Sequence, residues 1–201
     1  MKLLLLINFC LLPTLTLASP NIIVLGDSLS AGYGINQKDS WVSLLKNRIS
    51  TRKIDYTIIN ASISGETTSG GLSRIGSILD QEPEIIVLEL GANDGLRGLP
   101  LGEMKQNLTN IIEMGIEKNS KILLVGMRIP PNYGRRYSEN FALIYVELAK
   151  KYQIQLVPFL LAGLDNKAKF QADGLHPTAE AQTIILENVW LKLKPMLSPD
   201  R

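Results

Sequence analysis

The sequence contains a single histidine, His176, and an aspartate, Asp173, stands three residues before it. An imidazole can act as a general base, and a carboxylate at this spacing can hold one ring nitrogen and fix the tautomer. A serine, Ser28, follows Gly26-Asp27 directly after a short apolar segment. At a strand-to-helix junction its hydroxyl would be exposed, and the start of the helix would favour developing negative charge. A serine, a base and an orienting carboxylate are the parts needed for nucleophilic acyl transfer.

Acyl transfer also needs hydrogen-bond donors for the oxyanion of the tetrahedral intermediate. The glycine-rich segment 62–71 contains Gly65, where a backbone N–H can approach a ligand closely. Asn93, within Gly91-Ala-Asn-Asp-Gly95, could offer the N–H of a neutral side-chain amide. Taken singly, these features have simpler explanations: a helix cap at Ser28, a flexible loop and an Asx turn. Together, and with only one histidine available, they predict the site of a serine acyl hydrolase.

The elements that would position these residues are visible as an alternation of strands and helices. Short segments that are apolar on both faces predict the buried strands of a parallel sheet at residues 21–25, 56–60, 84–90, 121–125 and 154–157. Amphipathic segments predict helices at residues 41–50, with Ser40 as the cap, and at 69–80, 101–118, 138–152 and 179–193, with Pro177 at the start of the last. This order predicts an α/β domain with one doubly wound sheet, whose ligands lie beyond the carboxyl ends of the strands.

In this order, the four candidate segments resemble the four sequence blocks of the SGNH (GDSL) hydrolase superfamily. Longer motifs are similar to the bacterial periplasmic multifunctional thioesterase I/protease I/lysophospholipase subfamily, namely Gly26-Asp-Ser-Leu-Ser-Ala-Gly-Tyr33, Asn60-Ala-Ser-Ile-Ser-Gly65, Gly91-Ala-Asn-Asp-Gly-Leu-Arg-Gly98 and Asn132-Tyr-Gly-Arg-Arg-Tyr137. The resemblance covers nearly all of residues 21–197. It implies a three-layer α/β/α, flavodoxin-like fold with a five-stranded parallel sheet, and an acyl-ester hydrolase that needs no cofactor and no metal.

The resemblance also implies roles for individual residues. Ser28 would be the nucleophile, His176 the general base and then the general acid, and Asp173 the residue that orients His176. The backbone N–H groups of Ser28 and Gly65 would form the oxyanion hole with the Asn93 side chain. The reaction would proceed through an acyl-Ser28 intermediate and release a fatty acid from an ester, lysophospholipid or acyl thioester.

The segment 132–137 would lie over the acyl groove in this subfamily. We therefore expect the substrate to contact four residues of this region, namely Ile129, Pro130, Asn132 and Tyr133. The alternative is a surface loop with two exposed arginines. Glu66 departs from the aspartate that close relatives often have, and this departure leaves the catalytic roles untouched.

The first 18 residues predict a signal peptide that is cleaved after Ala18. Lys2 precedes an apolar run over residues 3–12, which is far shorter than the roughly 20 residues of a membrane-spanning helix. A retained N-terminal anchor is the alternative. Cleavage would also remove Cys10, the only cysteine, and a mature chain without thiols fits an oxidising compartment. We therefore expect an exported protein, periplasmic or secreted, with a single hydrolase domain over residues 19–201.

The composition of the chain limits the kinds of partner that we expect this protein to bind. The chain has 201 residues and a net charge of +2 without a basic stripe, which argues against a nucleic-acid partner. No later segment approaches spanning length, so we expect no stable membrane insertion, and the resemblance favours a monomer. The expected partner is a small acyl ester or lysophospholipid.

Three other functions remain open at this stage. The first is a carbohydrate (acetyl) esterase on the same scaffold, and the second is a non-catalytic exported binding module. The third is a metal hydrolase using Asp27, Glu66, Asp173 and His176. One histidine among carboxylates, without a recognisable ligand spacing, argues against a metal site.

Overall fold

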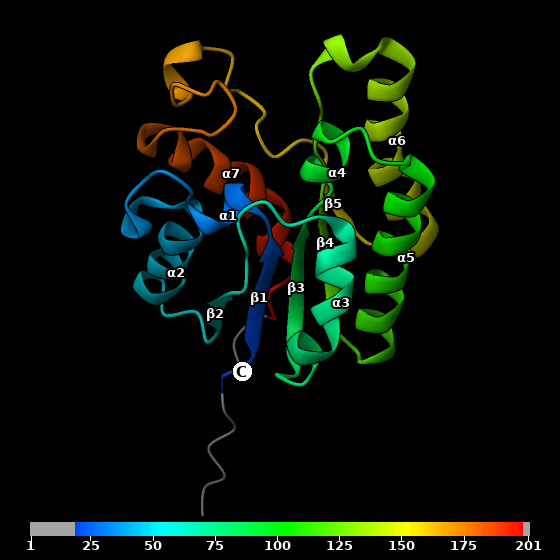
Figure 1. The fold of residues 1–201 in the computed structure, drawn as a ribbon. Helices are drawn as coiled ribbons and strands as arrows, with labels where there is room; N and C mark the ends of the chain where they lie inside the picture. Colours follow the sequence, from blue (N-terminus) through cyan, green and yellow to red (C-terminus); the bar gives the residue numbers. More distant parts are fainter. Residues whose placement is uncertain (1–18, 199–201) are drawn as a thin grey trace, which may run out of the picture.

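The computed structural model describes residues 19–198, and its centre is a five-stranded parallel sheet with strand order β2-β1-β3-β4-β5 (Figure 1). The strands are β1 (Asn21–Gly26), β2 (Thr57–Asn60), β3 (Pro83–Glu89), β4 (Lys121–Val125) and β5 (Gln155–Val157). All five predicted strands are present, close to the expected ends. The predicted α/β class with a doubly wound, five-stranded sheet is confirmed.

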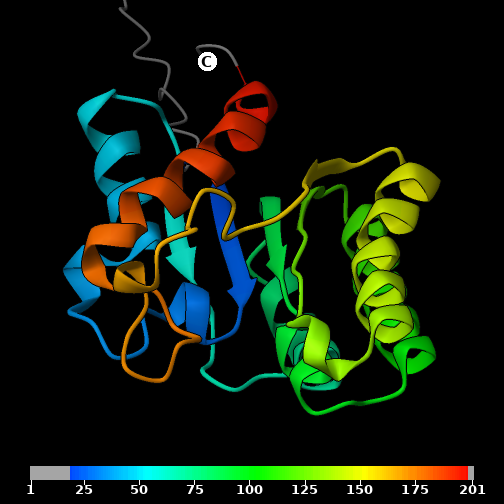
Figure 2. The same cartoon turned by 90° about the horizontal axis from the view of Figure 1, so that it is seen from above.

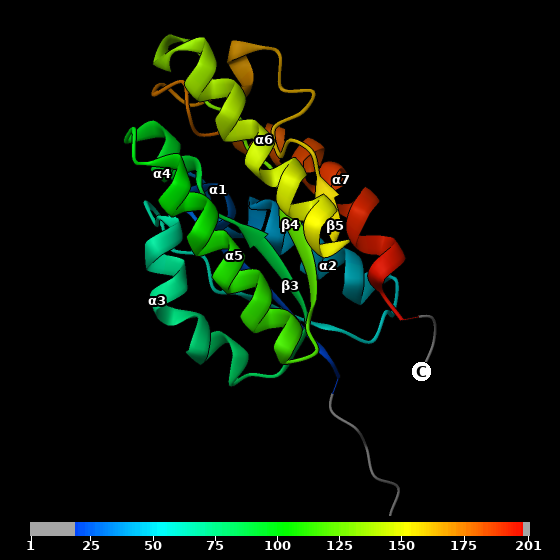
Figure 3. The ribbon, with the colours of Figure 1, turned by 90° about the vertical axis from the view of Figure 1, so that its right-hand side faces the viewer.

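The helices of the described residues are α1 (Ser28–Ala31), α2 (Trp41–Thr51), α3 (Thr68–Leu79), α4 (Ala92–Leu96), α5 (Leu101–Glu117), α6 (Arg135–Tyr152) and α7 (Gln182–Leu193). Short 3-10 turns lie at Gln37–Asp39, Pro131–Tyr133, Lys167–Lys169, Ala179–Ala181 and Lys194–Met196. Helices α2 and α7 pack together on one face of the sheet, and α3, α5 and α6 cover the other (Figures 2 and 3). These are the three layers that the resemblance implies.

The core lies between the sheet and its two helical layers. The residues of β1 from Ile22 to Leu25 are fully buried, as are the residues of β3 from Ile85 to Leu88. This burial follows from covering both faces of the sheet, and it explains why these segments read as continuous apolar runs. Ser40 caps α2, as predicted, by accepting a hydrogen bond from the Ser43 N–H.

Two helix starts differ from the sequence prediction. Helix α6 begins at Arg135 rather than Ser138, after Gly134 with φ of +95°. The last helical segment begins with a 3-10 turn at Ala179, and Pro177 precedes it in an isolated bridge with Phe170 instead of starting the helix. The strands point their carboxyl ends toward the top of Figure 1, where α1 and α4 begin.

The segment assigned to the signal peptide, residues 1–18, lies outside the described residues. Within residues 19–198, no helix combines the length and apolar character needed to cross a membrane.

Candidate active site

Ser28 is held at the end of β1 by a tight turn. The strand ends at Gly26, and Ser28 is the first residue of α1, which Asp27 caps by accepting the Leu29 N–H at 3.0 Å. A Cβ on Gly26 would lie only 2.7 Å from Glu89 Oε2. The close packing therefore requires glycine at this point, and the turn leaves the half-buried Ser28 at the carboxyl edge of the sheet.

His176 lies between Ser28 and Asp173. Its Nε2 atom is 2.8 Å from Ser28 Oγ, and its Nδ1 atom is 2.7 Å from Asp173 Oδ2. With a proton on Nδ1, the ring donates to the carboxylate and leaves Nε2 free to accept the serine hydroxyl proton. The structure thus brings within hydrogen-bond reach the three residues that the sequence assigned to a catalytic triad.

Asp173 stays ionised because neighbouring donors bind its carboxylate. Its Oδ1 atom accepts the backbone N–H groups of His176 at 3.0 Å and Leu175 at 2.9 Å. The backbone N–H of His176, then its ring and then the Leu175 N–H lower the pKa of Asp173 to about 2. The carboxylate is therefore charged at neutral pH, and it can stabilise a protonated imidazole.

The loop that carries His176 is fixed to the rest of the site by hydrogen bonds. The Gln171 N–H donates to His176 O at 2.7 Å, and the Gln171 side-chain amide donates to Tyr33 O at 2.8 Å. The ring of Tyr33 packs against the imidazole, with 4.5 Å between the ring centroids. These contacts hold the imidazole at a fixed position beside α1.

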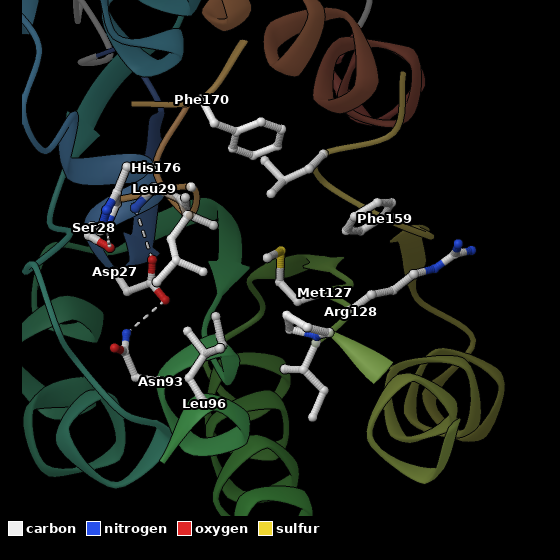
Figure 4. A pocket seen from close by; sticks show the side chains of 16 residues that line it. Asp27, Ser28, Leu29, Asn93, Leu96, Met127, Arg128, Phe159, Phe170 and His176 are labelled. Atoms are coloured by element: carbon white, nitrogen blue, oxygen red, sulfur yellow. Dashed lines mark hydrogen bonds between the residues drawn. The ribbon is translucent and has the colours of Figure 1, made fainter. Parts of the chain in front are cut away.

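The two remaining candidates, Gly65 in the loop after β2 and Asn93 in α4, lie close together, because the Asn93 side chain reaches the carbonyl oxygen of Glu66. Gly65 has φ of +80°, a conformation that favours glycine, and its carbonyl oxygen accepts a hydrogen bond from Arg97 Nη2 at 2.7 Å. Asn93 lies in α4, and its Nδ2 atom donates to Asp27 Oδ2 at 3.1 Å and to Glu66 O at 3.0 Å. Figure 4 shows the bond between Asn93 and Asp27.

A buried aspartate outside the predicted site, Asp94, links α4 to the N-terminus of α3. Asp94 is 3% exposed and accepts the backbone N–H of Thr68 at 2.9 Å and the hydroxyl of Thr68 at 2.6 Å. It thereby supplies a carboxylate at the N-terminus of α3, whose own first turn contains no acidic residue. Its place next to Asn93 is the one hint of this role in the sequence.

An apolar cavity of about 390 Å³ opens beside Ser28 and His176 (Figure 4). Ser28, Asn93 and His176 are among the residues that line it. The rest of its wall is mainly apolar, with Leu29, Ala92, Leu96, Met127, Ile129, Pro130, Phe159, Leu161, Phe170 and Leu175. The cavity is in the size range of small-ligand sites and suits a hydrocarbon chain better than a polar group.

The predicted substrate-binding residues divide into two pairs. Ile129 and Pro130 line the cavity, whereas Asn132 and Tyr133 are not among its lining residues. The Tyr133 hydroxyl instead donates to Leu96 O at 2.9 Å and supports the wall from outside.

The aromatic part of the wall is not among the predicted substrate-binding residues. A place for Phe159 in the cavity wall could have been predicted, because this residue follows β5 at the carboxyl edge of the sheet. Phe170 lies in an irregular segment that gives no such signal.

The residues weighed for a metal site are engaged in other interactions. Glu66 forms an ion pair with Arg74, and Asp27 binds Asn93. Within the described part of the chain, no group of three or more His, Cys, Asp or Glu side chains is placed to hold a metal ion.

Burial of Asp27 should make the stability of the fold depend on pH. The residue is 1% exposed, and burial raises its pKa from the ordinary 3.8 to about 6, despite the hydrogen bonds from Leu29 and Asn93. Because the unfolded chain releases this proton at a lower pH, the contribution of Asp27 to the free energy of unfolding should fall as pH rises from about 4 to about 6.

The variant Asp27→Asn should lack this dependence. We expect its free energy of unfolding, relative to the original chain, to increase by roughly 2 to 3 kcal/mol between about pH 4 and about pH 7, since one pKa unit corresponds to about 1.4 kcal/mol. Urea denaturation of both proteins at the two pH values measures the difference. A difference that stays constant with pH would contradict a raised pKa at Asp27.

A parallel sheet of this topology, with a serine, a histidine and an aspartate at its carboxyl edge, is the arrangement of an α/β serine hydrolase. The model of the GDSL-like lipase/acylhydrolase family matches residues 24–184, and the chain belongs to this family. Its relatives include esterase TesA of Pseudomonas aeruginosa, which is 43% identical over 96% of this chain and 98% of that protein. An arylesterase of Vibrio mimicus is 45% identical over 94% of this chain and 95% of that protein.

Other similar proteins also have the names of esterases or thioesterases. Thioesterase 1/protease 1/lysophospholipase L1 of Escherichia coli K12 is 38% identical, over 91% of this chain and 88% of that protein. The crystal structure of TesA gives a TM-score of 0.85 at 44% identity, over 88% of this chain and 99% of that one. Esterase EstA of Pseudoalteromonas, in a structure inhibited by monoethylphosphonate, gives a TM-score of 0.84 at 39% identity, over 88% of this chain and 98% of that one. The predicted superfamily, and the predicted class of a serine acyl-ester hydrolase, are confirmed.

Proposed function

We propose that Ser28, His176 and Asp173 are the catalytic triad of this hydrolase and that the acyl enzyme forms on Ser28. The observation that supports this proposal is the unbroken chain of hydrogen bonds from Ser28 Oγ through the imidazole to the Asp173 carboxylate, at 2.8 and 2.7 Å. Each nitrogen of the histidine has the partner that its role requires. The direct test is the substitution of Ser28 by alanine.

The reaction comprises two acyl transfers. Ser28 Oγ attacks the carbonyl carbon of the ester while His176 Nε2 takes the hydroxyl proton. The imidazolium then protonates the leaving alcohol or thiol, and the bond to the leaving group breaks to leave an ester on Ser28. Water attacks this ester, His176 takes its proton and returns it to Ser28 Oγ, and the fatty acid is released. Asp173 remains ionised throughout because its pKa is about 2.

The oxyanion of each tetrahedral intermediate would bind to three donors. These are the backbone N–H groups of Ser28 and Gly65 and the side-chain amide of Asn93. Neither of the two backbone N–H groups has an acceptor within the described residues, which leaves both available for a ligand. Asn93 Nδ2 lies between Asp27 and Glu66 O at the same edge of the sheet.

The cavity should give the enzyme a preference for long acyl chains. An apolar cavity of about 390 Å³ accepts methylene groups, and each one that it buries contributes up to about 0.8 kcal/mol. We expect kcat/KM for p-nitrophenyl octanoate to exceed that for the acetate by about 10-fold or more, since partial burial of a few methylene groups suffices. The two esters share one leaving group, so their ratio reports acyl binding.

The opposite preference would support another function. If the acetate were the better substrate, the cavity would not bind the acyl chain, and the carbohydrate (acetyl) esterase would become the better assignment. The mainly apolar wall argues against a carbohydrate ligand, because sugar hydroxyls need hydrogen-bond partners when they are buried.

We also propose that the protein is exported after cleavage at Ala18, acts as a monomer and hydrolyses lysophospholipids or free esters. Export supports these substrates because acyl-CoA is not expected outside the cytoplasm. N-terminal sequencing and size-exclusion chromatography of the exported protein test cleavage and oligomeric state. A chain that retains residues 1–18 would contradict the leader assignment.

A further inference from the structure

Two buried carboxyl groups lie beneath the turn that carries Ser28, and the triad uses neither of them. Asp27 is 1% exposed and Glu89 is fully buried. They lie at the ends of neighbouring strands, because Gly26, which precedes Asp27 at the end of β1, pairs with Glu89 at the end of β3. Glu89 Oε2 accepts the backbone N–H of Asp27 at 3.2 Å and the hydroxyl of Ser30 at 2.7 Å. Glu89 therefore holds the turn on both sides of the serine.

The carboxylate of Asp27 joins this turn to the oxyanion hole. One oxygen accepts the Leu29 N–H at 3.0 Å, and the other accepts Asn93 Nδ2 at 3.1 Å (Figure 4). The second N–H of Asn93 is directed to Glu66 O at 3.0 Å. A flipped amide would place its oxygen against a carboxylate and a carbonyl, which repel it. Asp27 and Glu66 O together therefore favour the nitrogen, and not the oxygen, of the Asn93 amide at this position.

We propose that Asp27 is a positioning residue that acts through Asn93, its negative charge keeping the amide nitrogen at the oxyanion hole, while Glu89 holds the same turn as a neutral acid. This inference rests on the proposed role of Asn93. In the free enzyme both N–H bonds of Asn93 have acceptors, so the forming oxyanion shares the amide with Asp27 and Glu66 O. The amide is held in place before substrate arrives, which is the property of a preorganised donor.

The surroundings decide which of the two acids is charged. Both oxygens of Asp27 accept hydrogen bonds, whereas Glu89 Oε1 has no hydrogen-bond partner, and no ion pair includes Glu89 within the described part of the chain. Burial raises the pKa of Glu89 well above its ordinary value, and the charge of Asp27 raises it further. The other titratable groups that face the pair are His176, Glu66 and Tyr145. The pair therefore holds one negative charge, on Asp27.

A double-mutant cycle tests whether Asp27 acts through Asn93. The Asp27 carboxylate accepts the Leu29 N–H with one oxygen and the Asn93 amide with the other. The side-chain amide in Asp27→Asn has only one oxygen for these two donors, so we expect kcat to fall by roughly 10- to 100-fold with KM nearly unchanged. In the Asn93→Ala background the same substitution should lower kcat by less than about 3-fold, because Asn93, the residue through which Asp27 acts, is absent. The activities of the four proteins are compared with one soluble ester.

The outcomes of the cycle separate the inference from the proposed function. If Asp27→Asn lowers kcat by the same factor in the Asn93→Ala background as in the original chain, Asp27 has its effect through another contact, such as the cap of α1. The inference is then wrong. If Asn93→Ala alone leaves kcat intact, the proposed oxyanion hole is wrong, and the inference falls with it.

A titration of the natural Asp27 covers the case in which Asp27→Asn does not fold. The NMR resonances of the Asn93 side-chain amide, assigned by their absence in Asn93→Ala, should shift with pH as Asp27 takes up a proton. The His176→Ala background removes the imidazole as another source of a transition. Resonances that show no transition between about pH 5 and about pH 7 would overturn the inference.

Infrared spectroscopy tests the state of Glu89 directly. At neutral pH the enzyme should show the C=O stretch of a buried, protonated carboxylic acid, and this band should be missing in Glu89→Gln. The substitution is a matched one, because the amide oxygen can still accept the Asp27 N–H. Identical spectra in this region would show that Glu89 is ionised and would overturn its assignment as a neutral acid.

Discussion

Ser28→Ala should lower kcat for ester hydrolysis by on the order of 10⁴-fold or more, because the proposed acyl enzyme can no longer form. Binding of the acyl chain should persist, since the apolar residues that line the cavity are unchanged. Ser28 starts a short helix, and within the described residues its hydroxyl bonds to His176, so an alanine should not unfold the chain. A thermal melt of the variant next to that of the original chain verifies this point.

Covalent labelling identifies the nucleophile independently of turnover. A fluorophosphonate should label the original enzyme, and the label should be absent from Ser28→Ala. Ser62→Ala is a suitable control, because Ser62 lies on the neighbouring loop and its hydroxyl donates to Val24 O at 3.4 Å, away from the proposed triad. A label that persists in Ser28→Ala would place the nucleophile at another residue.

The sheet could be predicted from the sequence because its central strands are apolar on both faces. The segments that form β1 and β3 show no polar alternation, and their ends were correct within one residue. Helices α1 and α4 could not be predicted in the same way. They contain four and five residues, which is too few to show an apolar period of about 3.6 residues.

The start of α6 shows how a polar first turn hides a helix. Residues 135–137 are Arg-Arg-Tyr, and the preceding Gly134 has a positive φ and no side chain to cap the helix. The sequence pattern therefore predicts a helix start at Ser138, a residue type that commonly caps helices. In the folded protein the Ser138 N–H donates to Gly134 O, inside the first turn.

The sequence allowed a prediction of which residues form the site, but not of the hydrogen bonds that these residues make. A single histidine left no choice of base, and Asp173 stands three residues before it. The hydrogen bonds of Asn93 depend instead on how α4 is rotated against α1, which no local pattern encodes. The aromatic cavity wall likewise combines Phe159 and Phe170 from loops that meet only in the folded chain.

Asn93→Ala should lower kcat by about 100-fold or more while the protein remains folded, because it removes one donor from the proposed oxyanion hole. A missing oxyanion donor in comparable sites costs about 3 kcal/mol in the transition state. The ground-state ester carries little charge on its carbonyl oxygen, so KM should change much less than kcat. Steady-state kinetics with one soluble ester separates the two parameters.

The effect of Asn93→Ala on the stability of the fold can be measured separately from its effect on kcat. The Asn93 amide bonds to Asp27 and to Glu66 O, so the loss of both bonds should lower the melting temperature only modestly. Asn110→Ala in α5 is a matched control, since the Asn110 side chain accepts a hydrogen bond from Gln106 at the surface of that helix. A folded Asn93→Ala enzyme that turns over at nearly the original rate would show that the backbone N–H groups of Ser28 and Gly65 suffice for the oxyanion, and the side chain of Asn93 would lose its assigned role.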